Sequence, residues 1–356
     1  MPNDMLELLL RDINPTEINA FVRAIQTPAD YLLTQSVLPE RTVNSVMWEN
    51  RGSRRRVAAA TYRAFDAQTK VATREITQFA TSGKLMPLGQ KYIIGELETI
   101  LQNVSRGMDA QGVVDDVYDD AAAHVLSIKH RLELAVGDLL IDGKFTLTGE
   151  NNLTIEADHN VPTANMPTAP TAWTDSTADM LGDEMRWIEV LRASGAPMPE
   201  RALTSYKAMR LAMGNDSYRA AYYGSVNSAS TIPTAVLSPQ EVNVVRGRYG
   251  LPPITPYDVK VPLPDGKDVR VLPENMFFLL PPNARQMGET QYGLTAEGIL
   301  LSNGSNPSIE REEAPGIIVT TGYQDDPPQV WSKGSAVALP VLYTPDIHIA
   351  ATLWEE

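Results

Sequence analysis

The sequence contains no cysteine among its 356 residues. This absence excludes disulfide bonds, thiolate nucleophiles and cysteine-based zinc sites, and it fits a reducing compartment. No apolar run approaches the roughly 20 residues that a transmembrane helix needs, so we expect no contact with a membrane. The first residues are acidic and lack the basic and then apolar order of a secretory signal peptide.

Sequence patterns of common catalytic sites are also missing. There is no G-x-S-x-G elbow, no G-x-G-x-x-G loop and no Walker loop, and no histidine belongs to an H-E-x-x-H motif. Asp116, Asp120 and His124 form a column at helical spacing, which could bind a metal if a second helix supplied ligands. We favour the alternative of acidic residues near a helix N-terminus beside a solvated histidine. We therefore predict a protein without catalytic residues, cofactor or metal.

The chain is acidic, but one segment is basic. The formal net charge is −14, which argues against a protein that coats nucleic acid with its whole surface. From position 44 to 79, seven basic and three acidic residues give +4, so the rest of the chain carries −18. We interpret this segment as a ribbon of two strands, Thr61–Phe65 and Val71–Ile76, that lies across an acidic surface. A solvated loop or a phosphate site is the alternative. The basic residues are Arg51, Arg54, Arg55, Arg56, Arg63, Lys70 and Arg74.

The strongest periodic signal predicts a long helix over Val113–Leu140. Its apolar residues recur in alternating steps of four and three, and they include Val125, Ile128 and Leu132. Acidic residues lie in its first turns and basic residues in its later half, as the helix dipole favours. A helix of roughly 40 Å can serve as a strut for other elements.

Flanking segments predict a mixed architecture with an inserted domain. Short helical patterns precede the ribbon and predict an arm that lies on another surface. Paired strands follow the long helix at Phe145–Thr148 and Leu153–Glu156. A second domain then begins near Trp173, with a helix capped by Asp175 or Ser176, a capping box at Ser238 and a central strand at Met276–Leu280. We expect positions 83–89 and 291–306 to be loops. We expect the C-terminal strands to return to the sheet beside the long helix.

This order of parts resembles the major capsid proteins of tailed bacteriophages, specifically the lambda-type major capsid protein E family with the Hong Kong 97 capsid fold. The order and spacing of several segments together carry the resemblance. They are Leu38–Arg41, Leu139–Lys144, Trp173–Asp179, Leu251–Ile254, Val271–Asn275, Leu279–Pro281, and Asp326–Pro328 with Trp331.

The resemblance implies an α+β fold and a structural role. It implies that copies assemble into pentamers and hexamers of an icosahedral shell around double-stranded DNA, without sequence-specific binding. The basic residues above would contact a neighbouring subunit. Residues 1–42 would form an N-terminal arm, 43–88 an extended loop, 89–167 a peripheral domain with the spine helix, 168–314 an axial domain, and 315–356 the return strands of the peripheral domain.

The same resemblance implies partners and a location. We expect portal, scaffold and possible decoration proteins as partners, the scaffold as a separate chain because no long segment precedes the arm. We expect assembly in the host cytoplasm and a final place in the virion capsid. An encapsulin-like cellular compartment is the alternative with the same fold. A soluble two-domain enzyme of unknown chemistry is the alternative from a different class.

Overall fold

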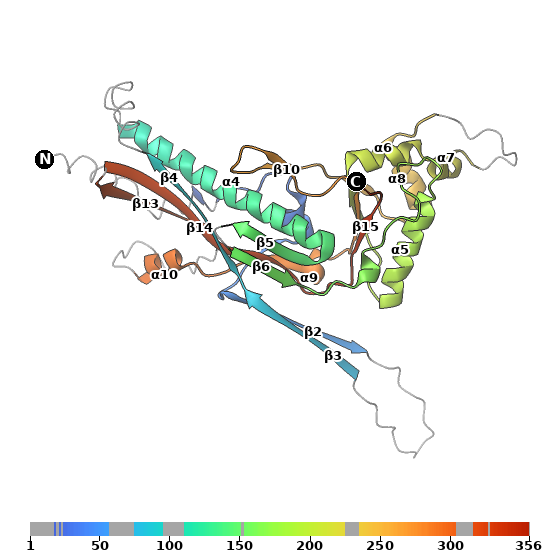
Figure 1. Cartoon of the computed structure of the whole chain (residues 1–356), viewed down its shortest axis with the longest axis horizontal. Helices are drawn as coiled ribbons and strands as arrows, with labels where there is room; N and C mark the ends of the chain where they lie inside the picture. The colour runs from blue at the N-terminus through green and yellow to red at the C-terminus, as the bar shows by residue number, and fades with distance from the viewer. Residues whose placement is uncertain are drawn as a thin grey trace, which may run out of the picture.

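A long helix, α4 (Ala110–Asp142), runs along the body of the molecule (Figure 1). The computed structural model describes residues 18, 21–22, 24–56, 75–94, 110–150, 153–224, 235–303, 316–326 and 328–355. The helix covers the predicted range and ends at Asp142, and the next residue, Gly143, has a φ of 75° in the left-handed region. The amide of Gly143 donates to the Leu139 carbonyl at 3.0 Å, which closes the last turn. The periodic pattern therefore predicted this helix correctly.

One face of α4 packs against a long sheet. The sheet has the order β1 (Glu40–Thr42), β12 (Gly288–Tyr292), β14 (Pro328–Leu342) and β13 (Ile318–Asp325), and β4 (Met86–Ile94) pairs with the first part of β14. Ile128 and Leu132 of the helix pack on Ala336 and Ala338 of β14. This part of the apolar stripe thus forms the seam between helix and sheet. A hairpin of β5 (Lys144–Glu150) and β6 (Leu153–Asp158) follows the helix, as predicted.

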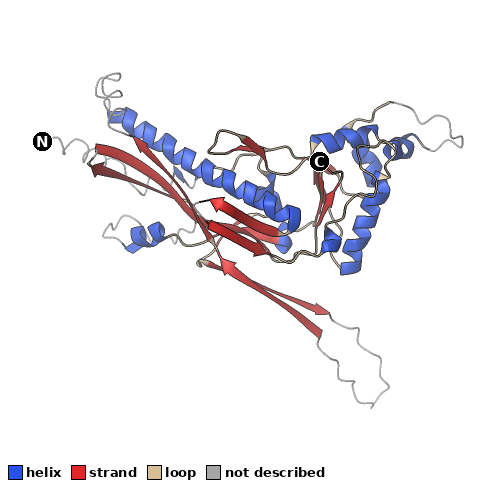
Figure 2. Cartoon of the chain, viewed as in Figure 1, coloured by secondary structure: helices blue, strands red, loops and turns tan. Residues whose placement is uncertain are grey.

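A second group of elements surrounds another sheet, of order β15 (Ile349–Thr352), β11 (Met276–Leu280), β7 (Arg201–Thr204) and β8 (Ile254–Pro256). Helices accompany it, as Figure 2 shows by colour. They are α5 (Met180–Ser194), α6 (Tyr206–Gly214), α7 (Asp216–Tyr223) and α8 (Pro239–Arg248). The predicted capping box is present, because Ser238 and Glu241 bond to each other's backbone amides. Shorter elements are η2 (Thr163–Asn165), β9 (Lys260–Pro262), β10 (Asp268–Arg270), α9 (Ala284–Met287) and α10 (Ala296–Asn303).

An antiparallel ribbon, β2 (Met47–Arg56) with β3 (Glu75–Lys84), leaves the body beside the β5–β6 hairpin (Figure 1). A ribbon was predicted in this segment, but the prediction missed β2 and most of β3 as strands. The predicted strand Thr61–Phe65 lies outside the described residues, and only the end of Val71–Ile76 falls in β3. The predicted loop at 83–89 is wrong too, because β3 continues to Lys84 and β4 begins at Met86.

The N-terminal arm lies on the chain's own helix. Val22 is buried against Val125 of α4, and the π-helix η1 (Leu33–Val37) is held by Glu133. The Glu133 carboxylate accepts from the amides of Leu33 at 3.0 Å and Thr34 at 2.9 Å. For these residues, the surface on which the arm lies is the chain's own helix α4.

Other predictions also need correction. Residues 291–306 are not all loop, because Gln291 and Tyr292 end β12 and α10 follows. The last strand, β15, pairs with β11 in the second sheet, while β13 and β14 do return to the sheet beside α4. The helix α5 is capped by Asp179, not by Asp175 or Ser176, because the Asp179 side chain accepts from the Gly182 amide. Asp175 instead caps a local turn at Thr177.

Candidate assembly interface

The ribbon carries the residues that the sequence singled out. Arg51, Arg54, Arg55 and Arg56 lie on β2, where Arg54 is opposite Thr77, Arg55 opposite Ile76 and Arg56 opposite Glu75. Arg63, Lys70 and Arg74 lie outside the described residues. Within the described part of the chain, β2 and β3 pair only with each other.

The root of the ribbon is anchored by an aromatic residue that the sequence analysis did not single out. Trp48 is 3% exposed, although its neighbours Val46 and Met47 are 48% and 49% exposed. Its indole stacks on the His159 ring, with the ring centroids 5.0 Å apart and the planes 21° from parallel. A lone tryptophan at the start of a polar, basic segment was the available signal, because such a ring needs a place to be buried.

A pocket of about 270 Å³ opens beside this root. Trp48 and Phe145 contribute aromatic surface, and Glu156 and Asp158 contribute carboxylates. Both carboxylates are already bound by Lys144, at 2.8 Å and 3.4 Å. The pocket therefore lies between the ribbon root and the β5–β6 hairpin, and its carboxylates at these two positions are already paired with Lys144.

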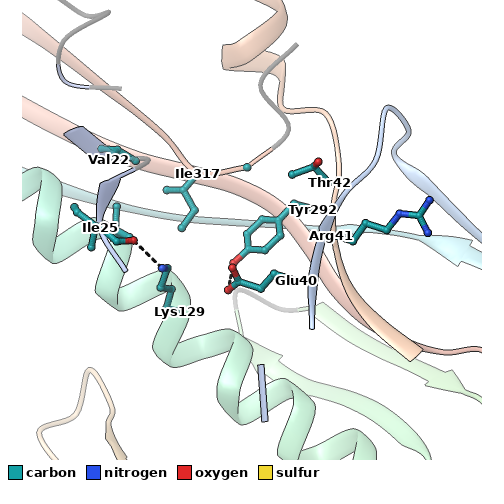
Figure 3. A pocket seen from close by; sticks show the side chains of 10 residues that line it. Val22, Ile25, Glu40, Arg41, Thr42, Lys129, Tyr292 and Ile317 are labelled. Carbon is teal, nitrogen blue, oxygen red and sulfur yellow. Dashed lines mark hydrogen bonds between the residues drawn. The ribbon is translucent and has the colours of Figure 1, made fainter. Parts of the chain in front are cut away.

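A second pocket, of about 490 Å³, lies between the arm, α4 and the long sheet (Figure 3). The Tyr292 hydroxyl donates to Glu40 at 3.0 Å, and the Lys129 ammonium donates to the Ile25 carbonyl at 3.0 Å. Burial lowers the pKa of Lys129, and it raises the pKa of Tyr292 well above the usual range. These hydrogen bonds hold the arm and β1 in place.

Arg41 marks the outer edge of this region. Its side chain is 59% exposed and bonds to Glu289 at 3.0 Å, and Figure 3 shows it directed away from Lys129 and Ile25. The hydrogen bond to Glu289 raises the pKa of Arg41. The Tyr343 hydroxyl also donates to Glu289, at 2.9 Å. The Arg41 cation is thus fixed by Glu289 at the rim of this pocket.

Two side chains of the proposed metal column, Asp120 and His124, both bond to Ser332. The Ser332 hydroxyl lies 3.1 Å from Asp120 and 3.0 Å from the Nε2 atom of His124. His124 is fully buried and stacks on Tyr92 with 4.5 Å between the ring centroids, so the interpretation of a solvated histidine was wrong. Burial lowers the pKa of His124, which favours its neutral form. Across the described residues, no group of three or more metal-binding side chains gathers.

The helices that the structure describes include none with the length and hydropathy of a membrane span.

Comparison with known proteins decides the identity. Residues 14–353 match the family described as phage major capsid protein E. The chain belongs to this family. It is a structural capsid protein of a tailed phage, and it is not an enzyme. No curated protein matched the sequence.

Solved structures support the fold of a phage major capsid protein E family member. One is described as a prophage capsid protein from E. coli CFT073, with 14% identity and a TM-score of 0.63 over 96% of this chain and 99% of that chain. Another is a phage-related protein from Bordetella bronchiseptica RB50, with 9% identity and a TM-score of 0.54 over 95% and 96%. The mature capsid of bacteriophage PhiM1 gives 10% identity and a TM-score of 0.50 over 92% and 88%.

These findings confirm the α+β, Hong Kong 97-like fold and the self-assembling shell function that the resemblance implied. The match to a phage family favours a phage shell over an encapsulin. The place of the protein is therefore the capsid of a virion.

Proposed function

We propose that this capsid protein forms the pentamers and hexamers of an icosahedral shell and that the β2–β3 ribbon is the principal contact between neighbouring copies. The observation that carries the proposal is that the ribbon leaves the body and, among the described residues, pairs only with itself. A ribbon of this kind is marginally stable alone in water, so a second surface would stabilise it.

Charge supplies the attraction. The ribbon segment carries +4 and the remainder of the chain −18, so a basic ribbon of one copy meets an acidic body of the next. Arg51, Arg54, Arg55, Arg56, Arg63, Lys70 and Arg74 are the proposed contact residues. Attraction between exposed charges is screened over about 8 Å at physiological salt, so assembly should weaken as ionic strength rises.

The proposal also assigns a role to each segment of the chain. Residues 1–42 act as the arm, 43–88 as the extended loop, 89–167 and 315–356 as the peripheral domain, and 168–314 as the axial domain around the symmetry centres. In sheet terms the division is not strict, because β12 joins the long sheet and β15 joins β11. The axial domain therefore contributes β12 to the sheet of the peripheral domain, and the peripheral domain contributes β15 to the sheet of the axial domain.

Partners beyond the chain itself are also part of the proposal. A scaffold protein, a portal protein and possible decoration proteins would act with the shell, and assembly would take place in the host cytoplasm. Double-stranded DNA would be enclosed without sequence-specific binding. The acidic body limits adhesion of the packaged DNA, since phosphate binding depends on basic side chains.

A deletion tests the role of the ribbon. Removing Ser53–Thr73 keeps the strand pairs from Met47–Lys84 to Gly52–Phe79, and residues 74–78 can close the shortened hairpin. We expect a folded protein, by circular dichroism and a cooperative thermal transition, that forms no closed shells in electron micrographs. Normal shells from this deletion would refute the proposed role. An internal deletion elsewhere is not an adequate control, so intact protein prepared in parallel serves as the reference.

A further inference from the structure

The direction of the ribbon depends on how rigidly its root is attached to the body. β2 and β3 contain ten residues each, so the paired strands extend roughly 30 Å from the root. A tilt of about 10° at the root would therefore displace their far end by roughly 5 Å. A ribbon that must reach a defined place on a second copy needs a rigid joint.

Trp48 is placed to be that joint. It is opposite Gly83 in the register of the ribbon, and its indole lies across Gly83. A Cβ atom at position 83 would be 2.6 Å from the indole Nε1 atom and 2.8 Å from Cε2. The indole thus occupies the space that any side chain at position 83 would need.

The other side of the indole is held by the body. His159 is 4% exposed, and its amide donates to the Gly143 carbonyl at 3.0 Å, which ties it to the end of α4. Burial lowers the pKa of His159, so its ring is neutral at pH 7 and stacks on the indole without a charge. The indole is therefore enclosed between β3 of the ribbon and the segment that follows β6.

The strands beside the root are fixed as well. The Leu85 amide donates to the Val46 carbonyl at 2.9 Å, and Leu85 is buried in the same apolar cluster as Trp48. A Cβ atom on Gly293 would be 2.4 Å from the Ser45 carbonyl oxygen, so the chain entering β2 lies directly on the end of β12. The segment that precedes β2 and the residue that follows β3 are therefore both held in place at the root of the ribbon.

From this geometry we infer that Trp48 is a positioning residue, which sets the direction of the β2–β3 ribbon through its contacts with Gly83 and His159. The inference rests on the proposed role of the ribbon as a contact between copies. Its content is separate, because it concerns the angle between ribbon and body within one copy.

The absence of cysteine makes the angle measurable. Ser53→Cys on β2 and Ala193→Cys on α5 provide the only two thiols for spin labels, and Ala193 is exposed. Pulsed electron resonance then gives the distance distribution between ribbon and body. Labelled chain is diluted into excess unlabelled chain, so that only distances within one copy are recorded.

Two substitutions and a control test the joint. Gly83→Ala should shift and broaden the distance distribution, because the new methyl group displaces the indole. Adding Trp48→Phe should restore a single narrow distribution, because the smaller ring leaves room for the methyl group. Gly247→Ala is the matched control, since nothing lies within 4 Å of its Cβ position. An unchanged distribution in Gly83→Ala would overturn the inference, as would a failure of the double variant to restore it.

Shell formation by the same variants separates this inference from the proposed function. We expect Gly83→Ala to reduce the yield of closed shells in electron micrographs and the double variant to recover it. If the distances change as expected but shells form normally, the joint is real and the ribbon's proposed contact role is wrong. If the distances do not change, the joint is refuted whatever the shells show.

Discussion

The Tyr257 hydroxyl donates a hydrogen bond of 2.6 Å to Glu133, which connects the chain after β8 to the C-terminal third of α4. Glu133 is fully buried, and it also accepts from the amides of Leu33 and Thr34 and from the Thr34 hydroxyl. One carboxylate therefore joins the arm, the long helix and the second group of elements. Burial, followed by the nearby charge of Glu133, raises the pKa of Tyr257, so its hydroxyl stays protonated and able to donate.

Replacing Glu133 by alanine should destabilise the protein strongly. The substitution leaves several buried donors without an acceptor, and each such loss costs about 1–3 kcal/mol. We expect a large fall in the urea midpoint of unfolding. Glu189→Ala is the control, because Glu189 and its partner Arg192 are 66% and 61% exposed, and such pairs contribute little. Equal midpoints for the two variants would contradict the account of Glu133.

The buried ion pair of Arg246 and Glu184 offers a second prediction. Both side chains are fully buried, 2.5 Å apart, and the Tyr218 hydroxyl bonds to both. Arg246→Met leaves the Glu184 charge without its partner, so we expect a loss of about 3–5 kcal/mol in the free energy of unfolding. Adding Glu184→Leu should recover part of the loss, because both charges are then gone. Losses that simply add would show that the two charges are not coupled.

His348 predicts a dependence of stability on pH. Burial lowers its pKa to about 4 in the folded protein, whereas the unfolded chain has the usual value near 6.5. Between these values the unfolded chain binds the extra proton, so stability falls as pH drops through this window and is unaffected above it. The loss contributed by His348 should be on the order of 3 kcal/mol.

The measurement compares urea unfolding at pH 7 and pH 4.5 for the wild type and for His348→Leu. The variant should lose less stability on acidification than the wild type. Burial also lowers the pKa of the other buried histidines, His124 and His159, but both residues are present in the wild type and in the variant. An equal pH effect in the two proteins would count against the assignment to His348.

A substitution at Gly334 tests how closely α4 packs on β14. A Cβ atom there would be 2.6 Å from the Cβ atom of His124, so helix and strand touch through this glycine. Gly334→Ala should push the helix from the sheet and cost about 1–3 kcal/mol. Gly247→Ala, with open space at its Cβ position, should not lower the melting temperature. A Gly334→Ala protein as stable as this control would show that the contact is looser than described.

Local patterns in the sequence predicted much of this fold. The spacing of Val125, Ile128 and Leu132 was sufficient for α4 because these three residues share one side of the helix and are buried in apolar clusters. Ser238 and Glu241 predicted the start of α8 because a capping box needs only neighbouring residues. The run Met276–Leu280 predicted an internal strand because both of its faces are covered.

The rest depends on contacts between distant residues. The sequence did not predict β2 and most of β3, because neither segment has an alternating apolar pattern. No sequence pattern singled out Glu133, Glu184 and Arg246, because charged residues are rarely buried and the partners of these three lie far away in the sequence. The role of Trp48 depends on Gly83 and His159 together, which sequence spacing does not connect.

The central claim is that copies of this chain assemble into a closed shell, in which the β2–β3 ribbon of one copy contacts a neighbouring copy. Electron microscopy of the purified full-length protein, over a range of salt and protein concentrations, tests it most directly. The account predicts closed shells of uniform size, with assembly weakening as salt rises. A small discrete oligomer under every condition would contradict it.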